Sequence, residues 1–123
     1  MDKTMGKTAV FDLSEALSQA DGDQDLFLTL AEIFLQESPK EAAAARAALE
    51  RLDGAGLAAA AHKLKGSVIQ MCAPRLFEST KRLEELGRQG DLAEASSVCT
   101  VVETRLDEVH AALRELITEG FPS

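Results

Sequence analysis

Tryptophan and tyrosine are absent from this 123-residue chain, and cysteine occurs only twice. The two cysteines, Cys72 and Cys99, cannot build a disulfide framework and do not have the spacing of a zinc site. A reduced, cytoplasmic protein with no metal site of its own is therefore expected. The chain also contains no apolar run long enough to span a membrane, and its N-terminus, MDKTMGKTAVFDL, has no apolar core of signal-peptide length.

Positive charge is in short supply as well. Lysine and arginine together number 13 against 21 acidic residues, which gives a formal net charge of -8 at pH 7. Nucleic-acid phosphates and anionic lipids repel such a chain, so neither nucleic acid nor a membrane is an expected partner. The sequence also has no glycine-rich phosphate loop and no basic patch.

Alanine, leucine and glutamate dominate what is present, as is typical of helical proteins. The length suits one domain with its own core. We expect residues 1–10 to form a flexible N-terminal segment and residues 11–119 to form a single helical domain.

Helix signals divide the first half of this domain. Asp12, with Glu15 three residues later, predicts the cap of a short helix that ends near Ala20. Asp23 predicts the cap of a second helix that runs to about residue 37. The apolar face expected for this second helix consists of Leu26, Phe27, Leu30, Ile33 and Phe34.

Ser38-Pro39-Lys40-Glu41 then combines an N-cap serine, a proline at the first helical position and a glutamate at the third. Either a new helix starts there or the existing helix kinks. The buried stripe predicted beyond this point comprises Ala42, Ala45, Leu49 and Leu52, and Asp53-Gly54 ends the helix.

Three further helices are predicted at about 55–71, 74–88 and 91–118. Phe77, Thr80, Leu83 and Leu86 are the inward candidates of the middle one. The last, capped by Asp91 with Glu94, carries a heptad seam at Leu92, Ala95, Cys99, Val102, Leu106, Val109, Leu113 and Leu116. Short connections make neighbouring helices antiparallel. The predicted fold is all-α: an antiparallel up-and-down four-helix bundle with a short extra N-terminal helix.

One histidine lies outside the core stripe of the 55–71 helix. His62, Lys65, Gly66 and Ile69 follow one another at helical spacing, with Ala58 beside them, on a sector away from the core residues. The core residues are Leu57, Ala60, Ala61, Leu64, Val68 and Met71. Glycine inside a helix costs about 1 kcal/mol relative to alanine, which is reasonable where a partner must approach closely.

An exposed neutral imidazole beside a lysine suits phosphoryl acceptance. The ring needs one free nitrogen, and Lys65 lies near enough to support the phosphoryl oxygens. The short turn near residue 72 places residues 83 and 84 level with His62, so Glu84 is expected within reach of the imidazole.

Simpler interpretations remain at this point. His62 is then an ordinary surface histidine, Lys65 a solvated lysine, Gly66 an aid to close helix packing, and Glu84 an ion-pair partner of Arg88 four residues on.

Other chemistry fits the two histidines poorly. A dyad of His62 with Cys72 is excluded because ten residues of helix separate them by about 15 Å. A metal site would need a ligand four residues after His62, where the sequence has glycine. His110, with Asp107 and Arg114 at helical spacing, is interpreted as part of a solvated face.

The heptapeptide AHKLKGS, residues 61–67, resembles the signature of histidine-containing phosphotransfer (HPt) domains of two-component phosphorelays. FDLSEALSQADGDQDLFLTLAEIFLQESP and APRLFESTKRLEELGRQGDL extend the resemblance over roughly residues 10–117. It implies that His62 is the phosphorylated histidine, that Lys65 lies near the phosphoryl group, and that Gly66 leaves room for the partner. Glu84 matches the position that contacts the imidazole in this family.

Two positions depart from the family pattern. Cys72 stands where the family often has glycine, and Val68 where a small residue is common. Both lie at the end of the His62 helix, away from the phosphorylation site itself.

The resemblance implies a phosphoryl carrier without ATP-dependent kinase activity of its own. His62 accepts a phosphoryl group from a receiver-domain aspartate and passes it to another receiver; no cofactor is expected here, and Mg²⁺ is expected in the receiver. Receiver domains and a sensor histidine kinase, hybrid or not, are the expected partners, docked over Ala58, Gly66 and Ile69. A monomer is expected. The alternatives are the histidine-bearing domain of a chemotaxis-type kinase and a non-catalytic helical adaptor.

Overall fold

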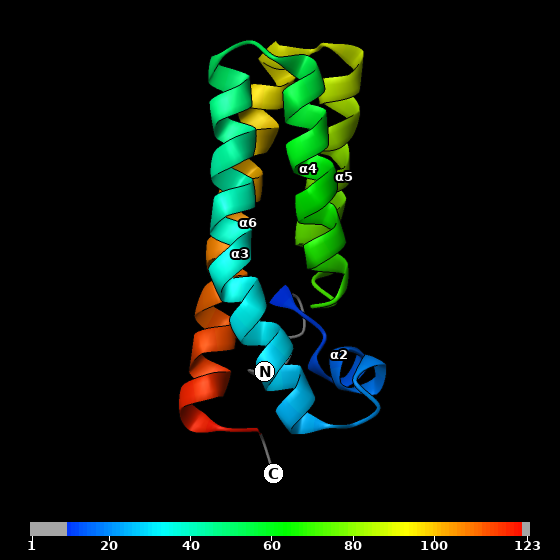
Figure 1. Ribbon diagram of the computed structural model, residues 1–123, viewed down its shortest axis with the longest axis vertical. Helices are drawn as coiled ribbons and strands as arrows, with labels where there is room; N and C mark the ends of the chain where they lie inside the picture. The colour runs from blue at the N-terminus through cyan, green and yellow to red at the C-terminus, as the bar shows by residue number, and fades with distance from the viewer. Residues whose placement is uncertain (1–9, 122–123) are drawn as a thin grey trace, which may run out of the picture.

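The computed structural model describes residues 10–121, and this part of the chain is helical without any strand. The helices are α2 (Leu13–Gln19), α3 (Gln24–Glu50), α4 (Gly54–Ile69), α5 (Pro74–Gln89) and α6 (Leu92–Glu119). Figure 1 shows the last four as an antiparallel bundle, with α2 beside its lower end. The predicted fold class is confirmed. The predicted flexible segment lies outside the described residues, except for Val10.

No described helix combines the length and the apolar character that a membrane span requires.

Aspartates begin most of these helices. The side chains of Asp12, Asp23 and Asp91 each accept a hydrogen bond from the backbone N–H three residues on, at 3.0, 3.0 and 3.2 Å. All three caps were predicted. Asp53, expected only at the end of the preceding helix, caps α4 in the same way at 2.8 Å. Each cap satisfies a first-turn amide that has no partner inside its own helix.

Helix α3 continues through Pro39, so of the two alternatives predicted there the continuing, bent helix is confirmed and a new helix capped by Ser38 is wrong. The Ser38 hydroxyl instead donates to the Phe34 carbonyl at 2.6 Å, inside the helix. Proline removes one backbone donor and crowds the preceding turn, which bends a helix without necessarily ending it. Figure 1 shows α3 changing direction along its length.

The heptad seam of α6 forms one wall of the core. Every seam position from Ala95 to Leu116 is buried, and Leu92 is half-buried. On α5, Thr80, Leu83 and Leu86 are buried as predicted, whereas Phe77 is half-buried.

Three predicted core residues are wrong. Leu26, Ile33 and Leu52 are 44%, 50% and 75% exposed. Leu26 and Ile33 lie seven residues apart on α3, at the edge of its buried stripe. Leu52 lies beyond the end of α3 in the left-handed conformation, with φ 58°. Helical spacing alone does not show how wide the buried stripe is.

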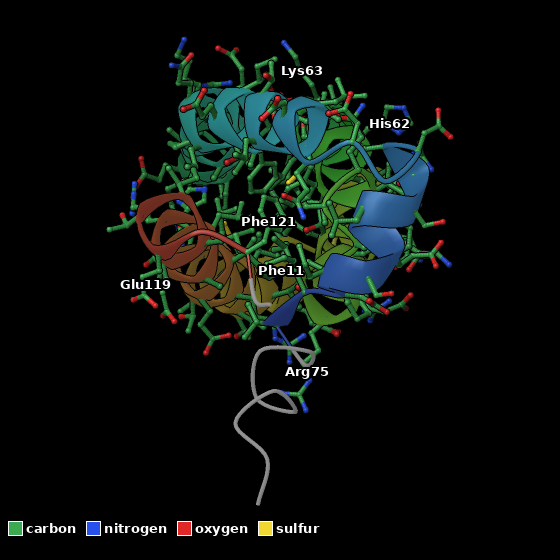
Figure 2. All side chains as sticks on the ribbon, turned by 90° about the horizontal axis from the view of Figure 1, so that it is seen from below. Phe11, His62, Lys63, Arg75, Glu119 and Phe121 are labelled. Atoms are coloured by element: carbon green, nitrogen blue, oxygen red, sulfur yellow. The ribbon has the colours of Figure 1, made fainter. Side chains whose placement is uncertain are left out.

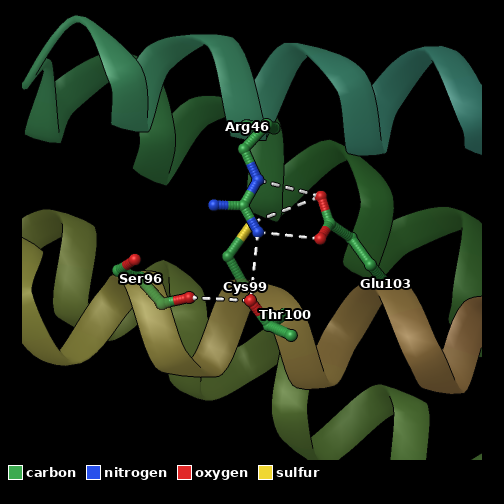
Figure 3. Close-up of polar contacts among 5 residues, drawn as sticks. All are labelled: Arg46, Ser96, Cys99, Thr100 and Glu103. Atoms are coloured by element: carbon green, nitrogen blue, oxygen red, sulfur yellow. Dashed lines mark hydrogen bonds and ion pairs between the residues drawn. The ribbon is translucent and has the colours of Figure 1, made fainter.

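Arg46 joins α3 to α6 (Figure 3). Its Nε donates to Glu103 at 3.0 Å and its Nη2 donates to the other Glu103 oxygen at 2.7 Å and to the Thr100 hydroxyl at 3.2 Å. The hydrogen bond from Arg46 lowers the pKa of Glu103, although partial burial opposes this effect. A two-pronged contact of this kind fixes both the register and the direction of approach of two helices.

His110 is buried, which corrects its interpretation as a solvated residue. Only 6% of it is exposed, its Nε2 lies 2.8 Å from Ser38 Oγ, and its ring meets Phe34 edge-on. The Ser38 proton is used on the Phe34 carbonyl, so Nε2–H of His110 donates to Ser38. The flanking charges Asp107 and Arg114 concealed this in the sequence.

This burial makes the stability depend on pH. Burial, with the positive charge of Arg114, lowers the pKa of His110 from its ordinary value of 6.5, and Asp107 opposes this only in part. As the pH falls, the unfolded chain therefore binds a proton at His110 more readily than the folded chain does. Stability is fully present above pH 6.5 and decreases as pH falls below it, by at most about 1.4 kcal/mol per pH unit. Urea unfolding at pH 7.5 and 5.5 should show a smaller decrease for His110→Gln, and an equal decrease would contradict this account.

Candidate functional site

The site forms beside a point where the backbones of α4 and α5 come close together at two glycines. A Cβ on Gly87 would lie 2.8 Å from the Ala58 nitrogen and 2.9 Å from the Gly54 carbonyl oxygen. A Cβ on Gly54 would lie 2.8 Å from the Gly87 carbonyl oxygen. This contact explains why Ala58, expected on the exposed face, is only 8% exposed. Because the backbones are close there, Glu84, three residues before Gly87 on α5, lies within reach of His62.

His62 projects from α4 into solvent, as Figure 2 shows from below the bundle. Its side chain is 66% exposed, and its Nδ1 lies 2.9 Å from Oε2 of Glu84 on α5. The predicted register between the two helices is therefore confirmed. The ring is held at one nitrogen and open at the other.

Glu84 is the buried member of the site, at 1% exposure. Lys65 Nζ lies 2.8 Å from its Oε1, and Arg88 shares Oε2 with His62. Burial raises the pKa of Glu84, but its contacts with Lys65, His62 and Arg88 outweigh burial and hold the pKa below its ordinary value. Glu84 is thus a carboxylate at neutral pH.

A carboxylate only accepts hydrogen bonds, so the nitrogen facing Glu84 must carry the proton. The neutral His62 ring is then the Nδ1–H tautomer, and the Nε2 lone pair points away from Glu84. This arrangement is that of an accessible nitrogen nucleophile whose ring orientation is fixed by a buried acceptor.

Arg88 was considered in the sequence only as a helix partner of Glu84. The structure shows that pair and the His62 contact together on the same carboxylate. Arg88 also lines a hollow of about 380 Å³ with His62, Ala58 and Ala59. The spacing of four from Glu84 was the available signal, but it could not show that the guanidinium lies beside His62.

Gly66 and Ile69 lie on the exposed side of α4. A Cβ built on Gly66 meets no described atom within 4 Å apart from the neighbouring backbone of its own helix, so Gly66 does not serve helix packing. Ile69 is 55% exposed. Ser67 donates mainly to the Glu41 carboxylate of α3 at 2.9 Å.

The two departures from the family pattern have different structural meanings. Cys72 adopts φ 53°, a left-handed conformation that favours glycine. Cysteine therefore replaces glycine there at some cost in backbone strain. Val68 is fully buried and belongs to the core, so its extra bulk does not touch the exposed face.

Across residues 10–121, no group of three or more histidine, cysteine or acidic side chains is placed to hold a metal ion.

Comparison with known proteins identifies the family. A model of the Hpt domain matches residues 29–114. The chain belongs to the Hpt domain family. Hpt domains are phosphocarrier modules that work with histidine kinases and receiver domains, so this Hpt domain has a histidine phosphotransfer role in a phosphorelay.

Solved structures agree with this Hpt assignment. The chain is similar to histidine-containing phosphotransfer protein B (HptB) from Pseudomonas aeruginosa PAO1, with 25% identity and a TM-score of 0.83 over 90% of this chain and 96% of that one. The HPT domain of an Hpt sensor hybrid histidine kinase from Shewanella has the same fold, with 18% identity, a TM-score of 0.80 and the same coverage of both chains. No curated protein sequence gives a significant match.

The two helical glycines of the site should respond oppositely to alanine. Gly66→Ala should raise the free energy of unfolding by about 0.5–1 kcal/mol, because alanine favours the helix and nothing described crowds its Cβ. Gly87→Ala should lower it by about 1–3 kcal/mol, because its Cβ would press on the backbone of α4. Chemical denaturation measures both. Destabilisation by Gly66→Ala would contradict this prediction, because it would mean that the fold of this Hpt domain requires glycine at this position.

Proposed function

We propose that His62 is the phosphoryl acceptor of this Hpt domain, and that it takes the group from a receiver aspartate and passes it to a second receiver. The observation that carries the proposal is the exposed imidazole whose Nδ1 is held at 2.9 Å by the buried Glu84. That contact directs the lone pair of Nε2 toward solvent, where a receiver can approach.

The transfer forms one bond and breaks one bond, and it needs no third reactant. The Nε2 lone pair attacks phosphorus, the bond between phosphorus and the aspartate oxygen breaks, and the aspartate leaves as a carboxylate. Glu84 stabilises the positive charge that develops on the ring through the retained Nδ1–H. The Mg²⁺ that assists the leaving carboxylate is expected in the receiver, so the proposal places no metal or cofactor on this chain.

Lys65 and Arg88 supply the cationic surroundings. Both contact Glu84, and together they outnumber its single negative charge. The excess positive charge beside the imidazole favours the phosphoryl oxygens in the transition state. Gly66, one turn after His62, leaves the space that a docked receiver needs. Ile69 and the small exposed part of Ala58 lie at opposite ends of the expected contact.

Receiver domains and a sensor histidine kinase, hybrid or not, are the proposed partners, and a monomer is the proposed state. The bundle offers a nucleophile and its setting, with no nucleotide site proposed. A role as the histidine-bearing part of a chemotaxis-type kinase would require phosphate to reach His62 from an ATP-binding domain.

The acceptor assignment predicts that His62→Gln takes up no phosphate. A receiver domain phosphorylated with acetyl phosphate should label the unaltered protein with an acid-labile, base-stable phosphate. Lys63→Gln is the matched control, because Lys63 is an exposed neighbour that makes no contact with Glu84. Persistent labelling of a folded His62→Gln variant would refute the assignment.

Loss of Lys65 should slow transfer without abolishing it. In Lys65→Ala we expect the single-turnover rate to fall about tenfold, because Arg88 still places a cation beside the imidazole. Rapid-quench measurements with a phosphorylated receiver would give this rate. A loss as complete as that of His62→Gln would mean that Lys65 has a different role.

A further inference from the structure

Helices α4 and α5 do not reach the lower end of the bundle. Figure 1 shows both of them stopping above α2, so this end consists of α2 and of parts of α3 and α6. Phenylalanines form much of its core: Phe11 is buried, and the rings of Phe27 and Phe121 meet edge-on with their centroids 6.1 Å apart. We call residues 13–38, which comprise α2, the turn after it and the part of α3 before Pro39, the lower unit.

Pro39 creates a hinge between the lower unit and the rest of α3. Proline has no backbone N–H, so the Leu35 carbonyl is left without its usual helical donor. The Ser38 hydroxyl donates to the Phe34 carbonyl at 2.6 Å, a contact that often bends helices. The turn around Pro39, where α3 changes direction in Figure 1, is therefore held less firmly by its own backbone than the rest of the helix.

Beyond this hinge, charged side chains hold α3 to two other helices. The Glu41 carboxylate accepts a hydrogen bond from Ser67 of α4 at 2.9 Å. Arg46 donates twice to Glu103 of α6, at 3.0 and 2.7 Å. Neither contact includes a histidine, and Glu41, the first carboxylate of α3 after Pro39, is already bonded to α4.

His110 of α6 lies against the hinge. The residue is 6% exposed, its Nε2 lies 2.8 Å from Ser38 Oγ, and its ring centroid lies 5.6 Å from that of Phe34. The α3 groups that contact the ring are therefore uncharged. The charged groups that act on it, Arg114 and Asp107, come from its own helix. The neutral ring thus joins α6 to the last turn of the lower unit.

A proton on His110 disrupts this contact. The neutral ring carries one N–H, which Ser38 accepts, whereas the imidazolium carries a second N–H and a full charge. Burial and the positive charge of Arg114 disfavour that charge and lower the pKa of His110, and Asp107 opposes them only in part. A buried charge without a matching partner is costly, so the charged ring is more stable where water reaches it. Water reaches the ring when the lower unit moves away from α6.

We propose that His110 is an acid-sensitive switch: its protonation releases the lower unit from α6 at the Pro39 hinge, while α4, α5 and the part of α3 beyond the hinge stay folded. The pH-dependent stability described above concerns the whole chain, whereas this inference assigns the opening to one part of it. It uses no residue of the His62 site, so it does not depend on the proposed function. The phosphoryl-acceptor site remains intact in the open form.

Native-state hydrogen exchange, followed by NMR on the full chain at pH 7.5 and 5.5, tests the proposal. Dividing the exchange rate of each amide by its intrinsic rate at that pH gives an opening constant. At both pH values, we expect amides of residues 28–37 to open at least about tenfold more often than amides in the middle of α4 and α5. Equal opening constants in the two regions would overturn the proposal, because the bundle would then open as a single unit.

The opening constant of residues 28–37 should rise about fivefold to tenfold from pH 7.5 to pH 5.5. About tenfold is the upper limit, because a group with an ordinary pKa of 6.5 can contribute at most that factor for each pH unit below this value. His110→Gln should reduce the rise to less than about twofold, since its amide can still donate to Ser38 but does not titrate.

His62→Gln is the matched control, because it removes the other of the two histidines in the chain. The rise in the opening constant of residues 28–37 should remain in this variant. A rise that survives His110→Gln, or one that disappears in His62→Gln, would contradict the assignment of the switch to His110.

Ser38→Ala tests the same contact without altering the histidine. It removes the acceptor of the buried Nε2–H, so the opening constant of residues 28–37 should rise at least about fivefold at pH 7.5. An unchanged opening constant would mean that this contact does not hold the lower unit, and it would overturn the proposal even if His110→Gln fails to fold.

Discussion

The buried carboxylate of Glu84 is the constraint on which the site depends. An ionised group at this depth is costly unless cations or hydrogen-bond donors surround it, and here two cations and the His62 imidazole do so from two helices. Two of those partners, His62 and Lys65, come from α4, while Arg88 comes from the same helix as Glu84. The contact therefore holds α4 against α5, orients the imidazole and gathers positive charge at one place.

This constraint requires the two helices to lie close together. The backbone contact among Gly54, Ala58 and Gly87 provides that closeness, because larger side chains at the glycines would force the helices apart. Elsewhere the bundle is joined by longer side chains, as in the contact of Arg46 with Glu103 between α3 and α6. The polar contacts of the two seams are similar in length, but the carboxylate beside His62 is buried, whereas Arg46 and Glu103 are both partly exposed.

Local features of the sequence predicted much of this. The caps at Asp12, Asp23 and Asp91 involve residues only three apart, and the turn before α5 is short enough to align Glu84 with His62. The prediction for His110 failed because it depends on a residue that is distant in the sequence. The burial of His110 requires Ser38 on another helix, and no periodicity along α6 contains that information. Pro39 was ambiguous because the residues around it fit both the start of a new helix and a bend in a continuing one.

The shared carboxylate also has an electrostatic consequence for a carrier that is loaded and emptied in turn. With the imidazole neutral, one carboxylate stands among two cations, and the surface beside His62 is positive. A phosphoryl dianion on Nε2, on a ring that keeps its Nδ1 proton, would cancel that excess positive charge. The empty and the loaded forms would then present different local fields to every approaching receiver, so that the phosphoryl group itself would distinguish the donor from the recipient.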